Sequence, residues 1–145
     1  VVDRAERVAG GEKDDAREAT LDRWFERSQR EREPERVARV RHWLEAVDPV
    51  GYARIYGLFA RADEALSGRL AGLRVPALFA TGEFDPNSTP EMSRRMAAEV
   101  PDGEERIVPG QRHMMAFADP EPVNRLLDDF FRRCGDSTRS REPTS

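Results

Sequence analysis

The sequence has 145 residues, of which 38% are hydrophobic and 36% are charged, and its formal net charge is -4. This length suits one domain of ordinary size, but the hydrophobic fraction is low for a large parallel sheet that is buried on both faces. Acidic residues lie among the many arginines, so the basic face that is typical of nucleic-acid-binding proteins is missing. We therefore expect no nucleic-acid partner.

Cysteine content and hydropathy narrow the class of protein further. Cys134 is the only cysteine, which rules out a disulfide within the chain and argues against a thiolate metal cluster. No stretch approaches the ~20 apolar residues of a membrane-spanning helix. Residues 1–11 carry too many charges for a secretory signal. We expect a cytoplasmic protein with no membrane partner.

Residues 1–72 have the pattern of short amphipathic helices. Breaks are expected at residues 10–11, around Pro34, and at Asp48, which can cap a helix that begins with Pro49. Apolar side chains recur at helical spacing in three stretches. These are Leu21, Trp24 and Phe25; Val37, Val40, Leu44 and Val47; and Tyr52, Ile55, Tyr56 and Phe59.

The pattern changes after residue 73. Residues 75–81 form a short apolar run closed by Gly82 and predict a buried strand, and residues 105–109 predict a second strand. Between them Thr89 is expected to cap a helix that begins with Pro90. Asp119 is expected to cap a last helix, whose apolar face is Val123, Leu126, Leu127, Phe130 and Phe131. Residues 136–145 contain no apolar side chain and are predicted to be disordered.

Two polar side chains follow the two predicted strands. Asp85 comes after the first strand and His113 after the second. The order strand, helix, strand implies a parallel pair with a right-handed crossover, and ligands bind at the carboxyl ends of such strands. We therefore expect Asp85 and His113 to face each other. A carboxylate can orient an imidazole that acts as a general base, although either residue alone is more often a turn or surface residue.

Residues 73–131 resemble the C-terminal end of the α/β-hydrolases. In that family a segment like residues 76–85 supplies the acid of a catalytic triad, one like residues 108–113 supplies the histidine, and a helix like residues 119–131 closes the domain. Residues 20–25 and 48–52 look like the helical cap of the enol-lactone hydrolases of aromatic catabolism. The resemblance implies an α/β fold, with a helical cap at residues 1–72, part of the hydrolase core at 73–135 and the tail at 136–145.

The family's nucleophile is not recognisable in this sequence. Family members place the acid and histidine after a serine in a G-x-S-x-G motif. No serine of this sequence has both flanking glycines of the motif. The serines are Ser28, Ser67, Ser88, Ser93, Ser137, Ser140 and Ser145. Cys134 is expected at the end of the last helix and is no substitute. The resemblance thus implies a hydrolase of a carboxylic ester or lactone in which Asp85 and His113 are catalytic and the serine lies elsewhere.

The same reading implies partners and alternatives. No metal or organic cofactor is expected, and the partners would be a small ester or lactone and either the N-terminal half of the fold or a second copy of the chain. Alone, the chain is expected to be inactive and poorly soluble as a monomer. An acyltransferase with the same triad and a non-catalytic ligand- or partner-binding module are the alternatives.

Other candidate features have structural interpretations. His42 is expected to pack within the helical segment. The aromatic residues are interpreted as the inner face of that segment, with the lining of an acyl pocket as the alternative; these are Trp24, Phe25, Tyr52, Tyr56 and Phe59. Asp85 begins a stretch that resembles a calcium-binding loop, but Pro90 stands where glycine is required and Met96 where glutamate is required.

Overall fold

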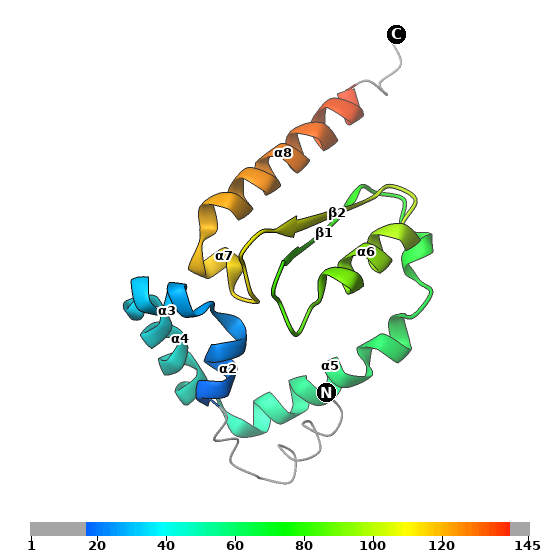
Figure 1. Ribbon diagram of the computed structural model, residues 1–145. Helices are drawn as coiled ribbons and strands as arrows, with labels where there is room; N and C mark the ends of the chain where they lie inside the picture. Colours follow the sequence, from blue (N-terminus) through cyan, green and yellow to red (C-terminus); the bar gives the residue numbers. More distant parts are fainter. Residues whose placement is uncertain (1–16, 140–145) are drawn as a thin grey trace.

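The computed structural model describes residues 17–139 and consists of a helical segment followed by a two-stranded α/β segment (Figure 1). The helical segment contains α2 (Arg17–Trp24), α3 (Arg27–Arg32), α4 (Pro34–Ala46), α5 (Pro49–Leu66) and the 3-10 helix η1 (Leu70–Gly72). The second segment contains β1 (Ala77–Gly82), α6 (Pro90–Glu99), β2 (Gly103–Val108), α7 (Met115–Ala118) and α8 (Pro120–Arg139). The predicted order of helices and strands is therefore confirmed, and the break predicted at residues 10–11 lies outside the described residues.

The ends of the helices follow local side-chain chemistry. Asp48 precedes α5, and its Oδ2 accepts a hydrogen bond from the backbone nitrogen of Gly51 at 2.7 Å, as its predicted capping role requires. A break that the sequence did not reveal separates α2 from α3. There the Gln29 Oε1 accepts from the backbone nitrogen of Glu26 at 2.9 Å, which satisfies a donor at the start of α3.

The sheet is a parallel pair, as predicted, with Ala77 opposite Gly103 and Gly82 opposite Val108. Helix α6 connects the strands and packs against both. Thr89 caps α6, since its side chain accepts from the backbone nitrogen of Met92 at 3.4 Å. These contacts bring the carboxyl ends of both strands to one edge of the sheet, where Asp85 and His113 follow.

The prediction of a buried first strand is wrong for most of its length. Residues 77–80 are only partly buried, and Thr81 and Gly82 alone are buried within β1. Val75, predicted to start the strand, lies before it and is 60% exposed. The physical reason is that the described sheet has two strands, so β1 lacks the flanking strand and second covering layer that bury a strand in a larger parallel sheet.

The main hydrophobic core joins the helical segment to α7. Leu21, Phe25, Val37 and Val40 are all less than 5% exposed and cluster with Ala118. Arg36 of α4 strengthens this junction, because its Nη1 donates to the carbonyl oxygens of residues 117 and 118. Helices α2 to α4 are therefore docked on the segment that follows the second strand, which is the segment that carries His113.

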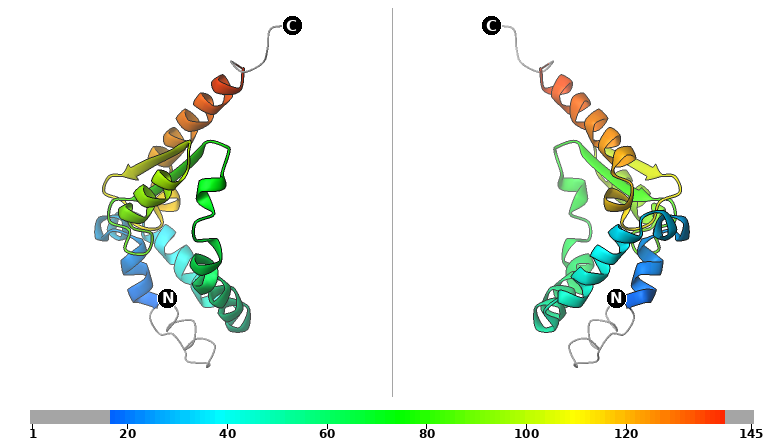
Figure 2. Two further views of the ribbon diagram at one scale, coloured as in Figure 1. Left: turned by 90° about the vertical axis from the view of Figure 1, so that its right-hand side faces the viewer. Right: turned by 90° about the vertical axis from the view of Figure 1, so that its left-hand side faces the viewer.

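The C-terminal end of helix α8 projects away from the rest of the molecule in all three views (Figures 1 and 2). Val123 on its predicted apolar face is buried, whereas Leu127 is 37% and Phe131 is 64% exposed. The helix continues to Arg139, four residues into the segment predicted to be disordered, because no proline interrupts it before residue 143. Residues 140–145 lie outside the described part of the chain. Within that part, no helix is long and apolar enough to span a membrane.

Candidate active site at the strand ends

Asp85 lies in a tight turn directly after β1 and is 6% exposed. Its Oδ1 accepts hydrogen bonds from the backbone nitrogens of Asn87 at 2.8 Å and Ser88 at 3.0 Å. The Thr81 hydroxyl lies 3.5 Å from Oδ2 and also donates to the carbonyl oxygen of Ser88. One carboxylate oxygen is therefore used to fix the turn, and the other is left to face a partner.

That partner is His113. Its Nδ1 lies 2.8 Å from Oδ2 of Asp85, and the side chains are 34% and 4% exposed respectively. Because an ionised carboxylate only accepts hydrogen bonds, this contact requires a proton on Nδ1. The other ring nitrogen, Nε2, has no hydrogen-bond partner among the described residues. The structure thus brings together the two residues that the sequence selected, and it fixes the tautomer of the imidazole.

The loop that carries His113 is held by helices α2 and α3. Oε1 of Gln111 accepts from Nε2 of Gln29 at 2.6 Å, and both side chains are buried. Arg112 forms an ion pair with Glu26.

Trp24 makes two contacts with the same loop. Its carbonyl oxygen accepts from the backbone nitrogen of Met114 at 3.1 Å, and its indole lies 5.7 Å from the His113 ring between centroids. Sequence reasoning missed these supports, since they join positions more than 80 residues apart and leave no local pattern.

Glycines allow the two strand ends to approach closely. A Cβ at Gly82 would lie 2.4 Å from the carbonyl oxygen of Gln111, which is too close for any larger residue without a backbone shift. Gly110 adopts a positive φ of 67°, a conformation that glycine adopts without steric cost. Its backbone nitrogen donates to Glu83 at 2.9 Å. The approach of residues 82 and 111 sets the separation between the acid and the histidine.

A cavity of about 410 Å³ lies beside His113, a size typical of small-molecule sites. Its apolar wall comes from α2, α4 and α5 and consists of Trp24, Leu44, Tyr52, Tyr56 and Phe59. The remaining lining residues are Thr20, Arg23, Pro86, Asn87, Ser88 and His113. Of the predicted aromatic residues, Phe25 belongs to the core and the other four line this cavity.

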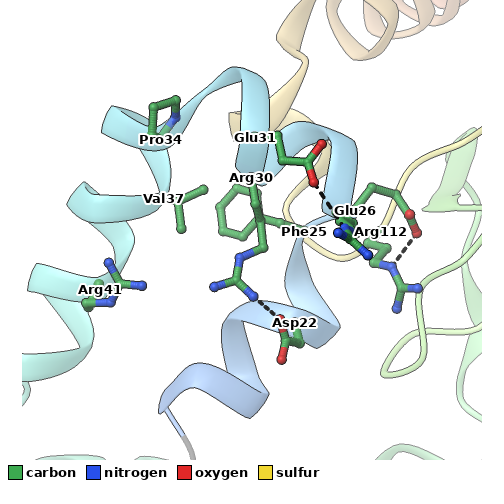
Figure 3. Close-up of a pocket in the computed structure, with 10 residues that line it drawn as sticks. Asp22, Phe25, Glu26, Arg30, Glu31, Pro34, Val37, Arg41 and Arg112 are labelled. Carbon is green, nitrogen blue, oxygen red and sulfur yellow. Dashed lines mark hydrogen bonds and ion pairs between the residues drawn. The ribbon is translucent and has the colours of Figure 1, made fainter.

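A second cavity, of about 550 Å³, lies between α2, α3 and α4 and is lined by charged residues (Figure 3). Arg30 in its wall pairs with Asp22 and Glu18, Arg41 pairs with Glu18, and Arg112 pairs with Glu26. Neither Asp85 nor His113 lines it. The guanidinium groups in its wall already have carboxylate partners. We therefore interpret the lining of this cavity as an ion-pair network on the surface of the helical segment.

One further sequence expectation has a definite outcome. His42 is exposed on α4, so the expectation that it packs within the helical segment is wrong; the buried positions of that helix are Val37 and Val40. Among the described residues, no group of three or more histidine, cysteine, aspartate or glutamate side chains could hold a metal ion.

No family model matches the sequence. The (E)-2-((N-methylformamido)methylene)succinate hydrolase of Acinetobacter baylyi is 38% identical over 129 residues, which are 88% of this chain and 47% of that protein. Two solved structures superpose on 90% of the chain with 27% identity. They are a thermophilic esterase from Thermogutta terrifontis, with a TM-score of 0.76, and the enol-lactonase from Burkholderia xenovorans LB400, with a TM-score of 0.77.

This chain belongs to the α/β-hydrolase family. It corresponds to the C-terminal part of the hydrolase fold, in the subgroup of the esterases and enol-lactonases, so the predicted family and fold class are confirmed. It spans about half the length of the relatives, covering 47% of the curated hydrolase and 47% and 49% of the two solved chains. Within this α/β-hydrolase, Asp85 and His113 occupy the ends of two adjacent parallel strands, and their catalytic role stays a prediction.

Proposed function

We propose that this chain carries the histidine and the acid of a Ser-His-Asp triad that hydrolyses a small carboxylic ester or lactone. The observation that carries the proposal is the 2.8 Å contact between Nδ1 of His113 and Oδ2 of Asp85. With Nδ1 bonded to the acid, Nε2 is the ring atom available for proton exchange with a substrate. Relatives that are a hydrolase, an esterase and an enol-lactonase support hydrolysis as the reaction.

In the proposed reaction, the serine, His113 and Asp85 each have a separate role. A serine hydroxyl attacks the carbonyl carbon while Nε2 of His113 accepts the hydroxyl proton. The imidazolium then donates that proton to the departing alcohol or enol oxygen as the acyl bond breaks. Water attacks the acyl-enzyme and gives a proton to His113, which returns it to the serine oxygen as the acyl–serine bond breaks and the acid product is released. Asp85 holds the imidazole in one orientation and stabilises its positive charge during both transfers.

We infer that the nucleophile is supplied from outside these 145 residues. No serine of this sequence has the flanking glycines of the nucleophile motif. Of the described serines, Ser88 lines the cavity, but no serine hydroxyl is hydrogen-bonded to His113. The 145-residue chain alone is therefore expected to be inactive, because neither a serine in the nucleophile motif nor a loop that would stabilise a developing oxyanion is recognisable in its sequence.

The test is to measure hydrolysis of a short-chain aryl ester and of an enol-lactone by the longest natural protein that carries these residues. Turnover should fall to background in His113→Ala and should be unchanged in His42→Ala, a matched control at the exposed histidine of α4. Unchanged turnover in His113→Ala would refute the proposed role. If the 145-residue chain alone turned over either substrate, and His113→Ala removed that activity, the nucleophile would lie within the chain.

A further inference from the structure

Gln111 lies at a point where several segments of the structure meet. Its backbone carbonyl oxygen accepts from the backbone nitrogen of Phe84 at 2.8 Å, in the turn that carries the acid. Its side chain bonds to α3 and to Asp119, which directly precedes α8. Because His113 follows only two residues later, the loop of the histidine is bonded at residue 111 to the acid turn, to α3 and to the start of α8.

The side chain of Gln111 is one link in a chain of amide hydrogen bonds. The backbone nitrogen of Glu26 donates to Oε1 of Gln29 at 2.9 Å, and Nε2 of Gln29 donates to Oε1 of Gln111 at 2.6 Å. Nε2 of Gln111 donates in turn to Oδ2 of Asp119 at 3.2 Å. The oxygen and the nitrogen of both amides therefore have partners, and both glutamine side chains are buried.

The direction of this chain is fixed at its two ends. The backbone N–H of Glu26 can only donate, and the ionised carboxylate of Asp119 can only accept. Turning over either amide would place two donors or two acceptors against each other, and an unpaired polar group in a buried position is costly. Gln111 therefore has a single bonded arrangement as long as α3 and Asp119 stay in place.

These bonds are separate from the cavity beside His113. Gln111 does not line that cavity, and neither do its two side-chain partners, Gln29 and Asp119. The arrangement of Gln111 can therefore affect the imidazole without contributing to the surface that a substrate would touch.

We propose that Gln111 is a positioning residue for His113, through which the docking of α3 sets the place of the imidazole opposite Asp85. The proposal rests on the function proposed above and adds a residue that acts through the histidine. The hydrogen bond to the acid and proton transfer at Nε2 require the same ring position, and a misplacement of about 1 Å can lower a rate about 100-fold. While α3 is docked, Gln29 holds Gln111 and the ring is aligned with the acid.

The test reverses one hydrogen bond of the chain. Gln111→Glu still accepts from Gln29 but brings a second carboxylate oxygen against Asp119, so the loop should shift. Adding Asp119→Asn supplies an amide donor to that oxygen and should restore the bond in the opposite direction. Asp119→Asn alone should have little effect, because its Oδ1 still accepts from Gln111.

The first readout is the kinetics of the longest natural protein that carries these residues. Gln111→Glu should lower kcat for a short-chain aryl ester about 10-fold to 100-fold and leave KM unchanged, and the double variant should recover most of the lost kcat. Val100→Ala is the control for lost stability, because Val100 is buried before the start of β2, at the other end of that strand from the histidine loop. It should leave kcat unchanged.

Nitrogen-15 NMR of the 145-residue chain gives a readout that needs no turnover. Gln111→Glu should weaken the downfield Nδ1 proton signal of His113, the double variant should restore it, and Val100→Ala should leave it as in the parent chain. If Gln111→Glu does not fold, Gln29→Met takes its place, since it removes the donor to Gln111 and should weaken the same signal.

Several outcomes would overturn the proposal. They are an equal loss of kcat in Gln111→Glu and Val100→Ala, a rise in KM at constant kcat, a double variant no better than the single one, and an unchanged His113 signal in folded Gln111→Glu. Failure of the proposed function is distinguishable, because hydrolysis would then not depend on His113 while its Nδ1 signal still responded to Gln111→Glu.

Discussion

Nδ1 of His113 and Oδ2 of Asp85 lie 2.8 Å apart although the two residues are separated by 28 positions in the chain. The contact is between a nearly buried acid and a partly exposed imidazole, so solvent reaches the histidine but competes little for the carboxylate. The hydrogen bond should therefore persist in solution and select a single tautomer.

The first prediction concerns this tautomer. Nitrogen-15 NMR of the histidine rings should show His113 protonated on Nδ1 when neutral, with a downfield Nδ1 proton. Asp85→Asn should weaken that signal and yield a mixture of tautomers, because an amide can donate as well as accept. His42 is exposed and provides the reference ring, assigned by its loss in His42→Ala. A His113 spectrum that matched the reference ring would contradict the prediction.

The second prediction concerns the close approach of the two strand ends. Gly82→Ala places a methyl group 2.4 Å from the carbonyl oxygen of Gln111. Relief requires a backbone shift, so we expect a loss of about 1–3 kcal/mol in the free energy of unfolding measured in urea, together with loss of the downfield His113 proton. Gly72→Ala, which meets nothing within 4 Å, should change stability by less than about 0.5 kcal/mol. Equal effects of the two substitutions would show that the approach is not tight.

The third prediction concerns the buried amides. Gln29 donates to Gln111, and Nε2 of Gln111 donates in turn to Oδ2 of Asp119 at 3.2 Å. Gln29→Met preserves the shape but leaves the buried Oε1 of Gln111 without a donor and the backbone nitrogen of Glu26 without its acceptor, which should cost about 1–3 kcal/mol in unfolding free energy. The double variant with Gln111→Met should cost less than the sum of the single changes, because both partners are then absent. Strict additivity would argue against a direct bond.

The fourth prediction concerns the exposed apolar surface of α8. Each strand of the described sheet has one unpaired edge, and Phe131 on α8 is 64% exposed. We expect the 145-residue chain to sediment as oligomers, because exposed apolar faces and open sheet edges both favour association. Phe131→Glu should shift the distribution toward monomer, whereas Arg125→Glu, at an exposed position on the same helix, should not. A monodisperse monomer of the parent chain would refute the prediction.

The sequence was informative where structure is local. Asp85 and His113 were recognisable because each follows an apolar strand, and Asp48 and Thr89 were recognisable because their side chains cap the next helix. The four-residue helix α7 was missed, since it is too short to show a helical period. The break after α2 was missed because Glu26 is not among the residues preferred at the start of a helix.

Packing between distant segments was not predictable in the same way. Nothing in residues 20–29 indicates that their polar groups bond to the histidine loop, because the bonds depend on docking after both segments have formed. The partial exposure of β1 has the same origin, since an apolar run shows that a strand favours burial but not what covers it.

The bonds that hold the histidine loop also have a consequence for the order of folding. Gln29 and Gln111 are 82 residues apart, and Glu26 and Arg112 are 86 apart. Pairing at such separations closes a long loop whose entropy must be lost before the contacts form, and proteins rich in such contacts fold slowly. The turn around Asp85 instead bonds to residues two and three positions away. We therefore expect the turn around Asp85 to form before the bonds that hold the His113 loop, so that the imidazole is fixed against the acid only after the first helices have docked.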